Sequence, residues 1–383
     1  MVMPKPKINR IFQITFTLVN IKSFININFI NLLSLQNDYS LELYNKINAE
    51  ERRLQIKAAN TERITLSFYK YHKILNTKLF RDYLFFHWNS MDILGRIYIA
   101  HEGINAQLSL PASQFKKFKS FLDEITFLKG VRLNIAVEQN NESFLKLTIK
   151  IKDKIVADGL DDSSFDVTNK GIHVNAKRFN ELLAEDSTLC LDMRNHYESE
   201  IGHFKGALTP DVDTFRESLT FIDKLLSKQN KDKKLLMYCT GGIRCEKASA
   251  YFKHKGFKNV FQLEGGIIEY AKQVKAEKIK NKFIGKNFVF DERRGERIGS
   301  YIIAKCHQCG VPCDTHVNCS NEACHLLFIQ CDSCQDKSQT CCSSECQDIF
   351  NLPMENQKQM RKGKHNSNKI FRKGRSKVLI FKY

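Results

Sequence analysis

The 383-residue chain contains no uninterrupted apolar run that is long enough to span a membrane. Its most apolar stretch, residues 11–35, is broken by Gln, Asn and Lys side chains, whereas a membrane-spanning helix needs about 20 mostly apolar residues in succession. The stretch also lacks the clean apolar segment and the small-residue cleavage site of a secretory signal peptide. These absences lead us to expect a cytoplasmic protein with no membrane partner.

Acidic side chains are fewer than basic ones, with 42 Asp and Glu residues against 60 Lys and Arg residues and a formal net charge of +18. Such a charge does not define a fold, but it favours an acidic partner such as RNA, DNA or an anionic membrane. The sequence also has no recognisable flavin-binding fingerprint and no evident iron motif of two histidines and a carboxylate. It therefore gives no sign of a flavin or a non-haem iron cofactor.

Ten of the thirteen cysteines lie between Cys306 and Cys346, in a chain much longer than a small disulfide-rich domain. Cys-x-x-Cys pairs in such a chain indicate metal binding or thiol chemistry rather than disulfides. The segment offers two such pairs, enough for one tetrahedral structural zinc site, and they are Cys306 with Cys309 and Cys331 with Cys334. A second site could draw on the other members of the segment, which are Cys313, Cys319, Cys324, Cys341, Cys342, Cys346, His316 and His325. The alternative is a set of reduced thiols without metal.

Periodicity and composition divide the chain into five parts. These are an atypical N-terminal extension (1–40), a ferredoxin-like domain (41–160), an α/β domain (175–277), the cysteine-rich segment expected to bind zinc (300–350) and a basic tail (351–383). A chain of this length suits two or three domains.

The two ends of the chain have the least regular sequence. Residues 1–40 have no caps and no clear periodicity, so we expect them to be disordered or not translated, with the product starting near Leu41 from a non-standard start codon. A genuine extension that folds against the ferredoxin-like domain is the alternative. From Gln357 to the end there are ten Lys and Arg residues and no Asp or Glu, a run that is either only solvated or contacts phosphates.

The ferredoxin-like assignment depends on the order β-α-β-β-α-β between residues 64 and 151. Strands are predicted at residues 64–71, 96–100, 104–110, 132–137 and 144–151, and helices at residues 77–89 and from residue 111. In the second helix Phe115, Phe118, Phe121 and Leu122 share one face. An α+β sandwich is therefore expected.

Residues 175–277 alternate short apolar strands, at 188–192, 235–238 and 260–263, with helical sequence, as in an α/β domain with a parallel sheet. Cys239 directly follows one of these strands, where active sites of open α/β sheets lie. It is the predicted catalytic residue.

The loop from Cys239 to Arg244 has the composition of an anion-binding loop. Gly241 and Gly242 allow successive backbone N–H groups to point inward, and Arg244 and the following helix N-terminus add positive charge. Such surroundings lower the pKa of a thiol, and the thiolate is the reactive form. Cysteine phosphatases have one more residue between cysteine and arginine, so this shorter loop suits a single sulfur atom. A buried structural thiol is the alternative.

Several longer segments resemble one family. They are residues 192–194, Glu198, residues 202–207, 238–249, 264–270, 100–107, 283–292 and 306–310. Two rhodanese signatures are recognisable. The first resembles residues 192–194, Glu198 and residues 202–207, and the second resembles the Cys239 loop. The whole set resembles the bacterial tRNA uridine-34 hydroxylases over about residues 41–375.

The resemblance implies an acylphosphatase-like N-terminal domain, a rhodanese domain and oxygen-dependent hydroxylation of uridine 34 in the tRNA anticodon to 5-hydroxyuridine. Molecular oxygen is then the co-substrate, the tRNA anticodon loop the partner, and Cys239 the family's active-site cysteine, which carries a persulfide. Arg244 is expected to stabilise anions, and Asp192 and Arg194 to buttress the loop. Cys245 either resolves a persulfide or forms a regulatory disulfide, or simply packs under the loop.

Two other functions compete with the hydroxylase. A thiosulfate sulfurtransferase or a persulfide carrier would fit the Cys239 loop equally well. A zinc-stabilised RNA-binding protein with an inactive rhodanese domain is the third possibility, and the intact Cys239 and Arg244 argue against it. The additional N-terminal and cysteine-rich domains favour the hydroxylase, because a minimal sulfurtransferase does not need them.

Overall fold

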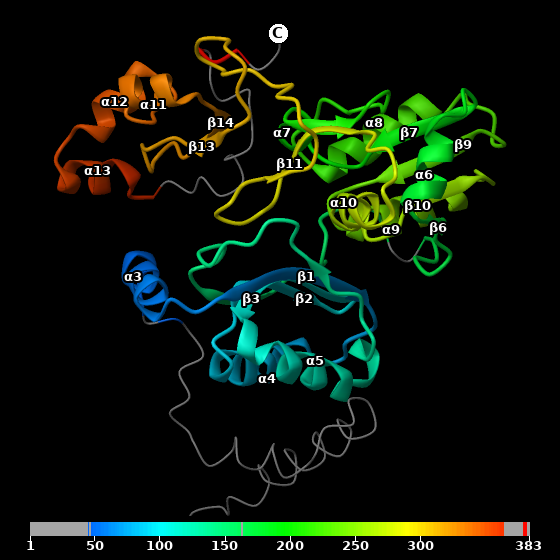
Figure 1. The fold of residues 1–383 in the computed structure, drawn as a ribbon, viewed down its shortest axis with the longest axis horizontal. Coiled ribbons are helices and arrows are strands. Elements are labelled where there is room, and N and C mark those ends of the chain that lie inside the picture. The colour runs from blue at the N-terminus through cyan, green and yellow to red at the C-terminus, as the bar shows by residue number, and fades with distance from the viewer. Residues whose placement is uncertain (1–44, 46, 162–163, 364–377, 381–383) are drawn as a thin grey trace, which may run out of the picture. The chain divides into compact units, whose positions relative to one another are not determined.

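The computed structural model describes residues 45, 47–161, 164–363 and 378–380 (Figure 1). The expectations for residues 1–40, including a start near Leu41, and for residues 364–377 of the basic tail fall outside these ranges. The described chain forms two compact units, one that ends at Ile155 and one that begins at Val156. Within the described ranges, no helix combines the length and the apolar character needed to cross a membrane.

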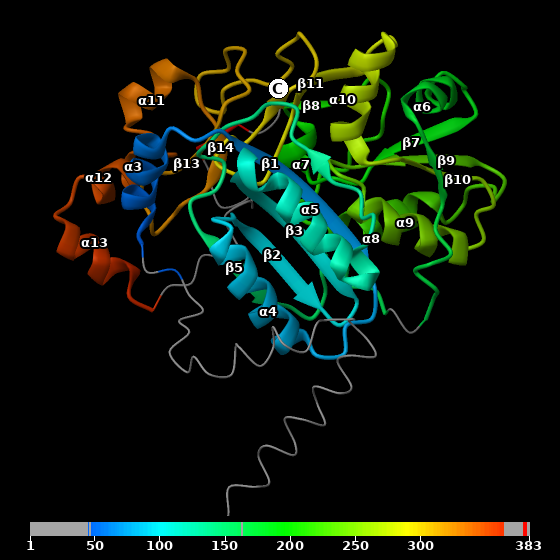
Figure 2. The ribbon, with the colours of Figure 1, turned by 60° about the horizontal axis from the view of Figure 1, so that its bottom comes forward.

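The first unit is a five-stranded sheet with α4 and α5 packed on one face (Figure 2). Its elements are α3 (Ala49–Ala59), β1 (Arg63–Tyr71), α4 (Thr77–Ser90), β2 (Leu94–Ala100), β3 (Gly103–Pro111), the short helix η1 (Ala112–Gln114), α5 (Phe115–Glu124), the short helix η2 (Thr126–Leu128), β4 (Asn134–Ile135) and β5 (Leu147–Ile151). The strand order is β4-β1-β3-β2-β5, in which β2 and β5 are parallel and the other pairs antiparallel. The ferredoxin-like, acylphosphatase-like fold is confirmed.

Aromatic side chains of both helices fill the space against the sheet. Trp88 of α4 and Phe118 of α5 are fully buried, and each ring centroid lies 6.4 Å from that of Phe68 on β1. Phe121 is buried on the same face of α5, as the helical spacing predicts, whereas Phe115 at the start of the helix is half-buried. These contacts form one continuous core.

Two features of this unit differ from the prediction. The strand predicted at residues 132–137 is reduced to the two-residue β4, because loop side chains replace it as partners of β1. The Gln139 side chain accepts from the Thr65 N–H at 2.7 Å, and the Asn141 side chain accepts from the Arg63 N–H at 2.9 Å. Helix α3 was not predicted; it is highly charged and buries only Ile56, so its apolar periodicity is weak.

The second unit starts with a parallel sheet of order β6-β10-β9-β7. Its strands are β6 (Ile172–Val174), β7 (Thr188–Asp192), β9 (Lys234–Tyr238) and β10 (Val260–Leu263), and its long helices are α6 (Ala176–Leu183), α8 (Phe215–Leu226), α9 (Ile243–His254) and α10 (Gly266–Glu277). Two separate hydrophobic clusters cover the sheet, one with α8 and α9 and the other with α6 and α10. This is the predicted α/β arrangement with helices on both faces.

The rest of the second unit joins the cysteine-rich segment to this sheet. Helix α7 (His196–Ser199) and β8 (Gly202–Phe204) follow β7, and β8 pairs with β11 (Phe283–Asn287) in a small sheet completed by β12 (Glu296–Arg297). The hairpin β13 (His316–Asn318) and β14 (Leu327–Ile329) and the helices α11 (Asp332–Ser338), α12 (Ser344–Phe350) and α13 (Met354–Arg361) follow.

Candidate active site and cysteine clusters

Cys239 directly follows β9, at the carboxyl end of the parallel sheet. Its side chain is 1% exposed, and the Gly242 N–H donates to its sulfur at 3.1 Å. Gly242 has a φ of 102°, a left-handed conformation that favours glycine. The backbone N–H groups of Arg244 and Cys245, in the first turn of α9, donate to the same sulfur. The loop therefore surrounds the sulfur with donors, as an anion site requires.

The pKa values of Cys239 and Cys245 are shifted in opposite directions. Burial by itself raises the pKa of Cys239, but the hydrogen bond from Cys245, the charge of Arg244 and the backbone donors outweigh it and lower that pKa from 9.0 to about 6. Burial, together with its hydrogen bond to Cys239, raises the pKa of Cys245 well above 9.0. At neutral pH, Cys239 is therefore the thiolate and Cys245 the thiol that donates to it.

Arg244 is held in place by Glu198. Its Nη1 and Nη2 donate to the Oε1 and Oε2 of Glu198 at 2.5 and 2.7 Å, and both side chains are buried. The Thr240 hydroxyl donates to the same carboxylate at 3.3 Å. Glu198 is fixed in turn by the capping box of α7, where it accepts from the Asn195 N–H at 3.1 Å. Arg244 therefore acts on Cys239 as a paired, fixed cation rather than as a mobile anion-binding group.

A second buried arginine braces the strand ends beside the loop. Arg194 donates from Nε and Nη2 to the two carboxylate oxygens of Asp192 at 2.9 and 2.7 Å. The Tyr238 hydroxyl donates to Asp192 at 2.8 Å, and Tyr238 immediately precedes Cys239. Asp192 and Arg194 are thus placed to buttress the loop, and they do not contact the sulfur through any hydrogen bond described.

Residues 283–292 contribute contacts to both arginines. The ring of Phe283 lies 5.8 Å from the Arg194 guanidinium carbon, and the Asn287 side chain accepts from Arg194 at 3.4 Å. The ring of Phe290 lies 6.0 Å from the Arg244 guanidinium carbon. The residue-by-residue reading of the sequence missed these contacts, although the segment itself was among those that resemble the family.

The first turn of α10 packs directly on the loop. The Ile267 and Ile268 N–H groups donate to the carbonyl oxygens of Cys239 and Thr240 at 3.0 and 3.2 Å. Gly266 has a φ of 65°, and a Cβ there would lie 2.5 Å from the Cys239 carbonyl oxygen. Glycine is therefore required for this close approach.

The four cysteines predicted to bind zinc lie together. The sulfurs of Cys306, Cys309, Cys331 and Cys334, called here the first cysteine cluster, are all within 4.8 Å of one another. The Cys309 and Cys331 sulfurs are 3.6 Å apart, and the Cys331 N–H points to the Cys306 sulfur at 3.4 Å. Tetrahedral zinc with bonds of about 2.3 Å places its sulfurs about 3.8 Å apart, so the cluster fits this ion.

A second cysteine cluster forms from Cys319, Cys324, Cys342 and Cys346, whose sulfurs also lie within 4.8 Å of one another. Two of its sulfur–sulfur distances are 3.7 Å (Cys324 to Cys342) and 3.6 Å (Cys342 to Cys346). Of the eight residues considered for a second site, Cys313, Cys341, His316 and His325 lie outside this cluster. The ligands could not be selected from the sequence because their spacings are irregular.

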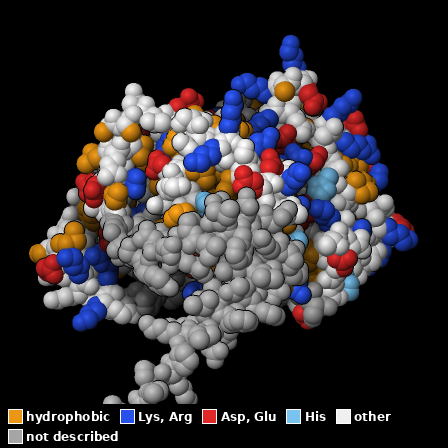
Figure 3. Space-filling view, turned by 90° about the horizontal axis from the view of Figure 1, so that it is seen from below, with side chains coloured by type: hydrophobic (Ala, Val, Ile, Leu, Met, Phe, Trp, Pro, Cys, Tyr) orange, Lys and Arg blue, Asp and Glu red, His pale blue; other side chains and the backbone are white. Residues whose placement is uncertain are grey.

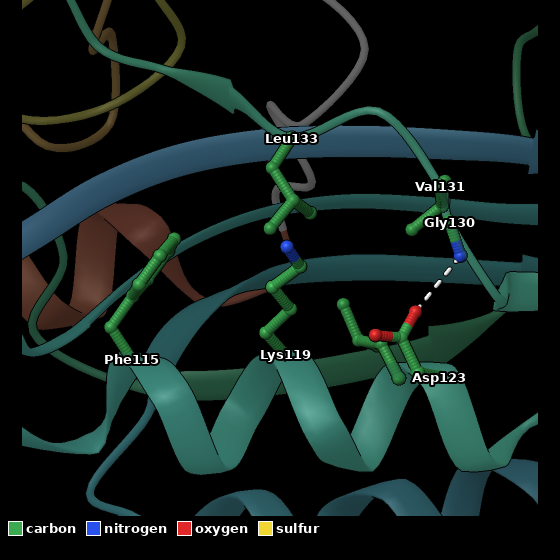
Figure 4. A pocket seen from close by; sticks show the side chains of 7 residues that line it. Phe115, Lys119, Asp123, Gly130, Val131 and Leu133 are labelled. Atoms are coloured by element: carbon green, nitrogen blue, oxygen red, sulfur yellow. Dashed lines mark hydrogen bonds between the residues drawn. The ribbon is translucent and has the colours of Figure 1, made fainter.

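One hollow and one face of the described residues add no candidate site to those predicted. A hollow of about 290 Å³ beside α5 is lined by Phe115, Lys119, Asp123, Leu133 and neighbouring residues, with Asp123 accepting from the Gly130 N–H at 2.9 Å (Figure 4). It contains none of the predicted site residues. On the face seen in Figure 3, Lys and Arg side chains lie among acidic and apolar ones rather than in one patch.

Comparison with known proteins covers nearly all of the folded chain. Residues 63–155 match the UPF0176 acylphosphatase-like domain, residues 175–273 the rhodanese-like domain and residues 284–347 the rhodanase C-terminal family. A protein of Leptospira interrogans named tRNA uridine(34) hydroxylase is 52% identical over 339 residues, which is 88% of this chain and 92% of that protein. The chain belongs to the tRNA uridine(34) hydroxylase family. The resemblance seen in the sequence is thereby confirmed.

Other relatives support the same family assignment. Proteins of the same name from Pectobacterium atrosepticum and Yersinia pestis are 52% and 50% identical, and each match covers 87% of this chain and 94% of the relative. Among solved structures, a rhodanese-like domain from Anabaena is 22% identical, with a TM-score of 0.24, and covers 30% of this chain and 78% of that domain.

Proposed function

We propose that the protein is an oxidoreductase that hydroxylates uridine 34 of tRNA to 5-hydroxyuridine, with molecular oxygen as co-substrate and Cys239 as the reacting residue. The observation that carries the proposal is the buried Cys239 sulfur, whose pKa is lowered to about 6 in a loop of backbone donors. A thiolate in such a loop is nucleophilic and can carry a second sulfur atom as a persulfide. Relatives that match this chain over 92% and 94% of their own length are named tRNA uridine(34) hydroxylase.

The substrate suits the charge of the chain. A net charge of +18 favours a polyanion such as tRNA. Uridine 34 lies in a single-stranded loop, so it can be unstacked and presented at little cost in duplex opening. We therefore propose that the protein acts on tRNA in the cytoplasm.

Zinc is proposed for both cysteine clusters. The first cluster and the second cluster each provide four thiolates, and a bound zinc ion supplies a structural cross-link in a segment with short helices and few strands. Elemental analysis of protein that has not met a chelator should find about two zinc ions per chain, by the ligand count of such sites. Cys324→Ser should lower this to about one. Folded protein with no zinc would contradict the proposal.

The activity is tested by mass spectrometry of tRNA nucleosides from cells with and without the gene. Complementation with Cys239→Ser should leave 5-hydroxyuridine absent, because a hydroxyl forms no persulfide. Cys245→Ser should be milder, since serine keeps a donor to the Cys239 sulfur. Unchanged 5-hydroxyuridine with Cys239→Ser would refute the role of Cys239. Two results together would favour the sulfurtransferase instead. The protein would transfer sulfur from thiosulfate to cyanide, and the 5-hydroxyuridine content of cells would not depend on the gene.

A further inference from the structure

A buried histidine of the cysteine-rich segment contacts the rhodanese part of the same unit. His307 lies between Cys306 and Cys309 and is 2% exposed. Its Nδ1 accepts from the Ile329 N–H at 3.2 Å, and a ring nitrogen that accepts carries no hydrogen. The hydrogen of the neutral ring is therefore on Nε2, which donates to Glu200 Oε1 at 2.8 Å.

Glu200 directly follows α7, the one-turn helix that carries Glu198. A four-residue helix has little stability of its own, so contacts with its surroundings fix its position. Tyr197 of the same helix is buried and packs in a hydrophobic cluster with Cys306 and Ile329. The His307–Glu200 hydrogen bond and the buried ring of Tyr197 thus hold α7 from the cysteine-rich side.

We infer that His307 is a positioning residue of the active site, through which the first cysteine cluster fixes α7 and therefore the Glu198–Arg244 pair beside Cys239. The inference rests on the proposed role of Cys239. Zinc in the first cluster would fix the backbone on both sides of His307, because Cys306 and Cys309 are ligands on either side of it. When α7 is released, Arg244 loses the carboxylate that holds it, and the Cys239 thiolate loses a nearby positive charge.

Glu200→Ala is the informative substitution, because it removes the acceptor without changing the cysteine clusters. The pH dependence of Cys239 alkylation by iodoacetamide is followed in the full-length protein by peptide mass spectrometry, and zinc is measured on the same samples. Arg244 and Cys245 face the Cys239 sulfur and are both retained. Zinc content should be unchanged, and the alkylation midpoint should rise by about 1 pH unit, the usual effect of weakening one opposite charge.

A second pair of variants guards against a misfolded Glu200→Ala protein. His307→Gln keeps a donor toward Glu200 and should retain the wild-type midpoint, whereas His307→Leu removes the donor and should raise it. Glu185→Ala is the matched control, because it breaks the ion pair with Lys234 at the other end of β9. It should leave the midpoint unchanged.

Three outcomes would overturn the inference. The first is an alkylation midpoint that stays at the wild-type value in both Glu200→Ala and His307→Leu. The second is a midpoint shift in Glu185→Ala as large as that in Glu200→Ala. The third is a midpoint shift that occurs only in variants that have lost zinc. Because alkylation does not require hydroxylation, the two proposals can fail separately. A strain that makes 5-hydroxyuridine without this gene would refute the function and leave the positioning result standing.

Discussion

The reactivity of Cys239 should depend on pH with an unusually low midpoint. A pKa of about 6 in place of 9.0 means that about 90% of the thiol is ionised at pH 7, against about 1% for an unshifted group. Because the thiolate is the nucleophile, alkylation of Cys239 should rise as the pH passes through about 6 and should level off above about 7.

The hydrogen bond from Cys245 and the positive charge of Arg244 both lower the pKa of Cys239. An opposite charge favours the ionised form, so Arg244→Met should raise the midpoint by about 1–3 pH units. The lowered pKa also stabilises the folded state above the pKa of the unfolded thiol, about 8.5, and this stabilisation is lost as the pH falls through about 6.

The alkylation midpoints of the wild-type protein and of Arg244→Met are measured by peptide mass spectrometry between about pH 5 and pH 10. This range includes the pKa values of both shifted and ordinary thiols. Cys245→Ser serves as the comparison, because serine still donates to the sulfur and should move the midpoint less than Arg244→Met. A wild-type midpoint near 9, or no change in Arg244→Met, would show that the loop does not stabilise the thiolate as described.

Two further predictions concern the supports of the loop. Glu198→Ala leaves the buried Arg244 guanidinium without its carboxylate and should destabilise the second unit by about 3–5 kcal/mol in chemical unfolding. Combining it with Arg244→Met should cost less than the two single substitutions add up to, and a double-variant cost equal to that sum would mean that the pair is not coupled. Gly266→Ala should lower activity and stability more than Gly206→Ala. Both glycines have a positive φ, but a Cβ at residue 206 meets no atom within 4 Å, whereas at residue 266 it meets the Cys239 carbonyl at 2.5 Å.

The parts of the site that are local in sequence could be predicted. Cys239, its glycines and Arg244 lie within six residues, and their residue types alone specify an anion-binding loop. The partner of Arg244 could not be found this way, because Glu198 is 46 residues away and reaches it only when α7 packs beside the loop. The fold was predictable where apolar periodicity is strong, as in α5, and not where the elements are short or highly charged, as in β4 and α3.

The boundary of the rhodanese domain does not coincide with the boundary of its active site. Sequence periodicity ends the α/β domain at residue 277, yet Phe283 and Asn287 contact Arg194, and Phe290 contacts Arg244. A buried arginine needs both a paired carboxylate and an enclosed environment, since removal of the cover admits water and weakens the pair. The carboxylates come from the rhodanese part, with Asp192 at the end of β7 and Glu198 in α7, and the cover comes from the segment that leads to the cysteine clusters. A fragment cut at residue 277 would therefore keep Cys239 and lose the surroundings that fix its acidity.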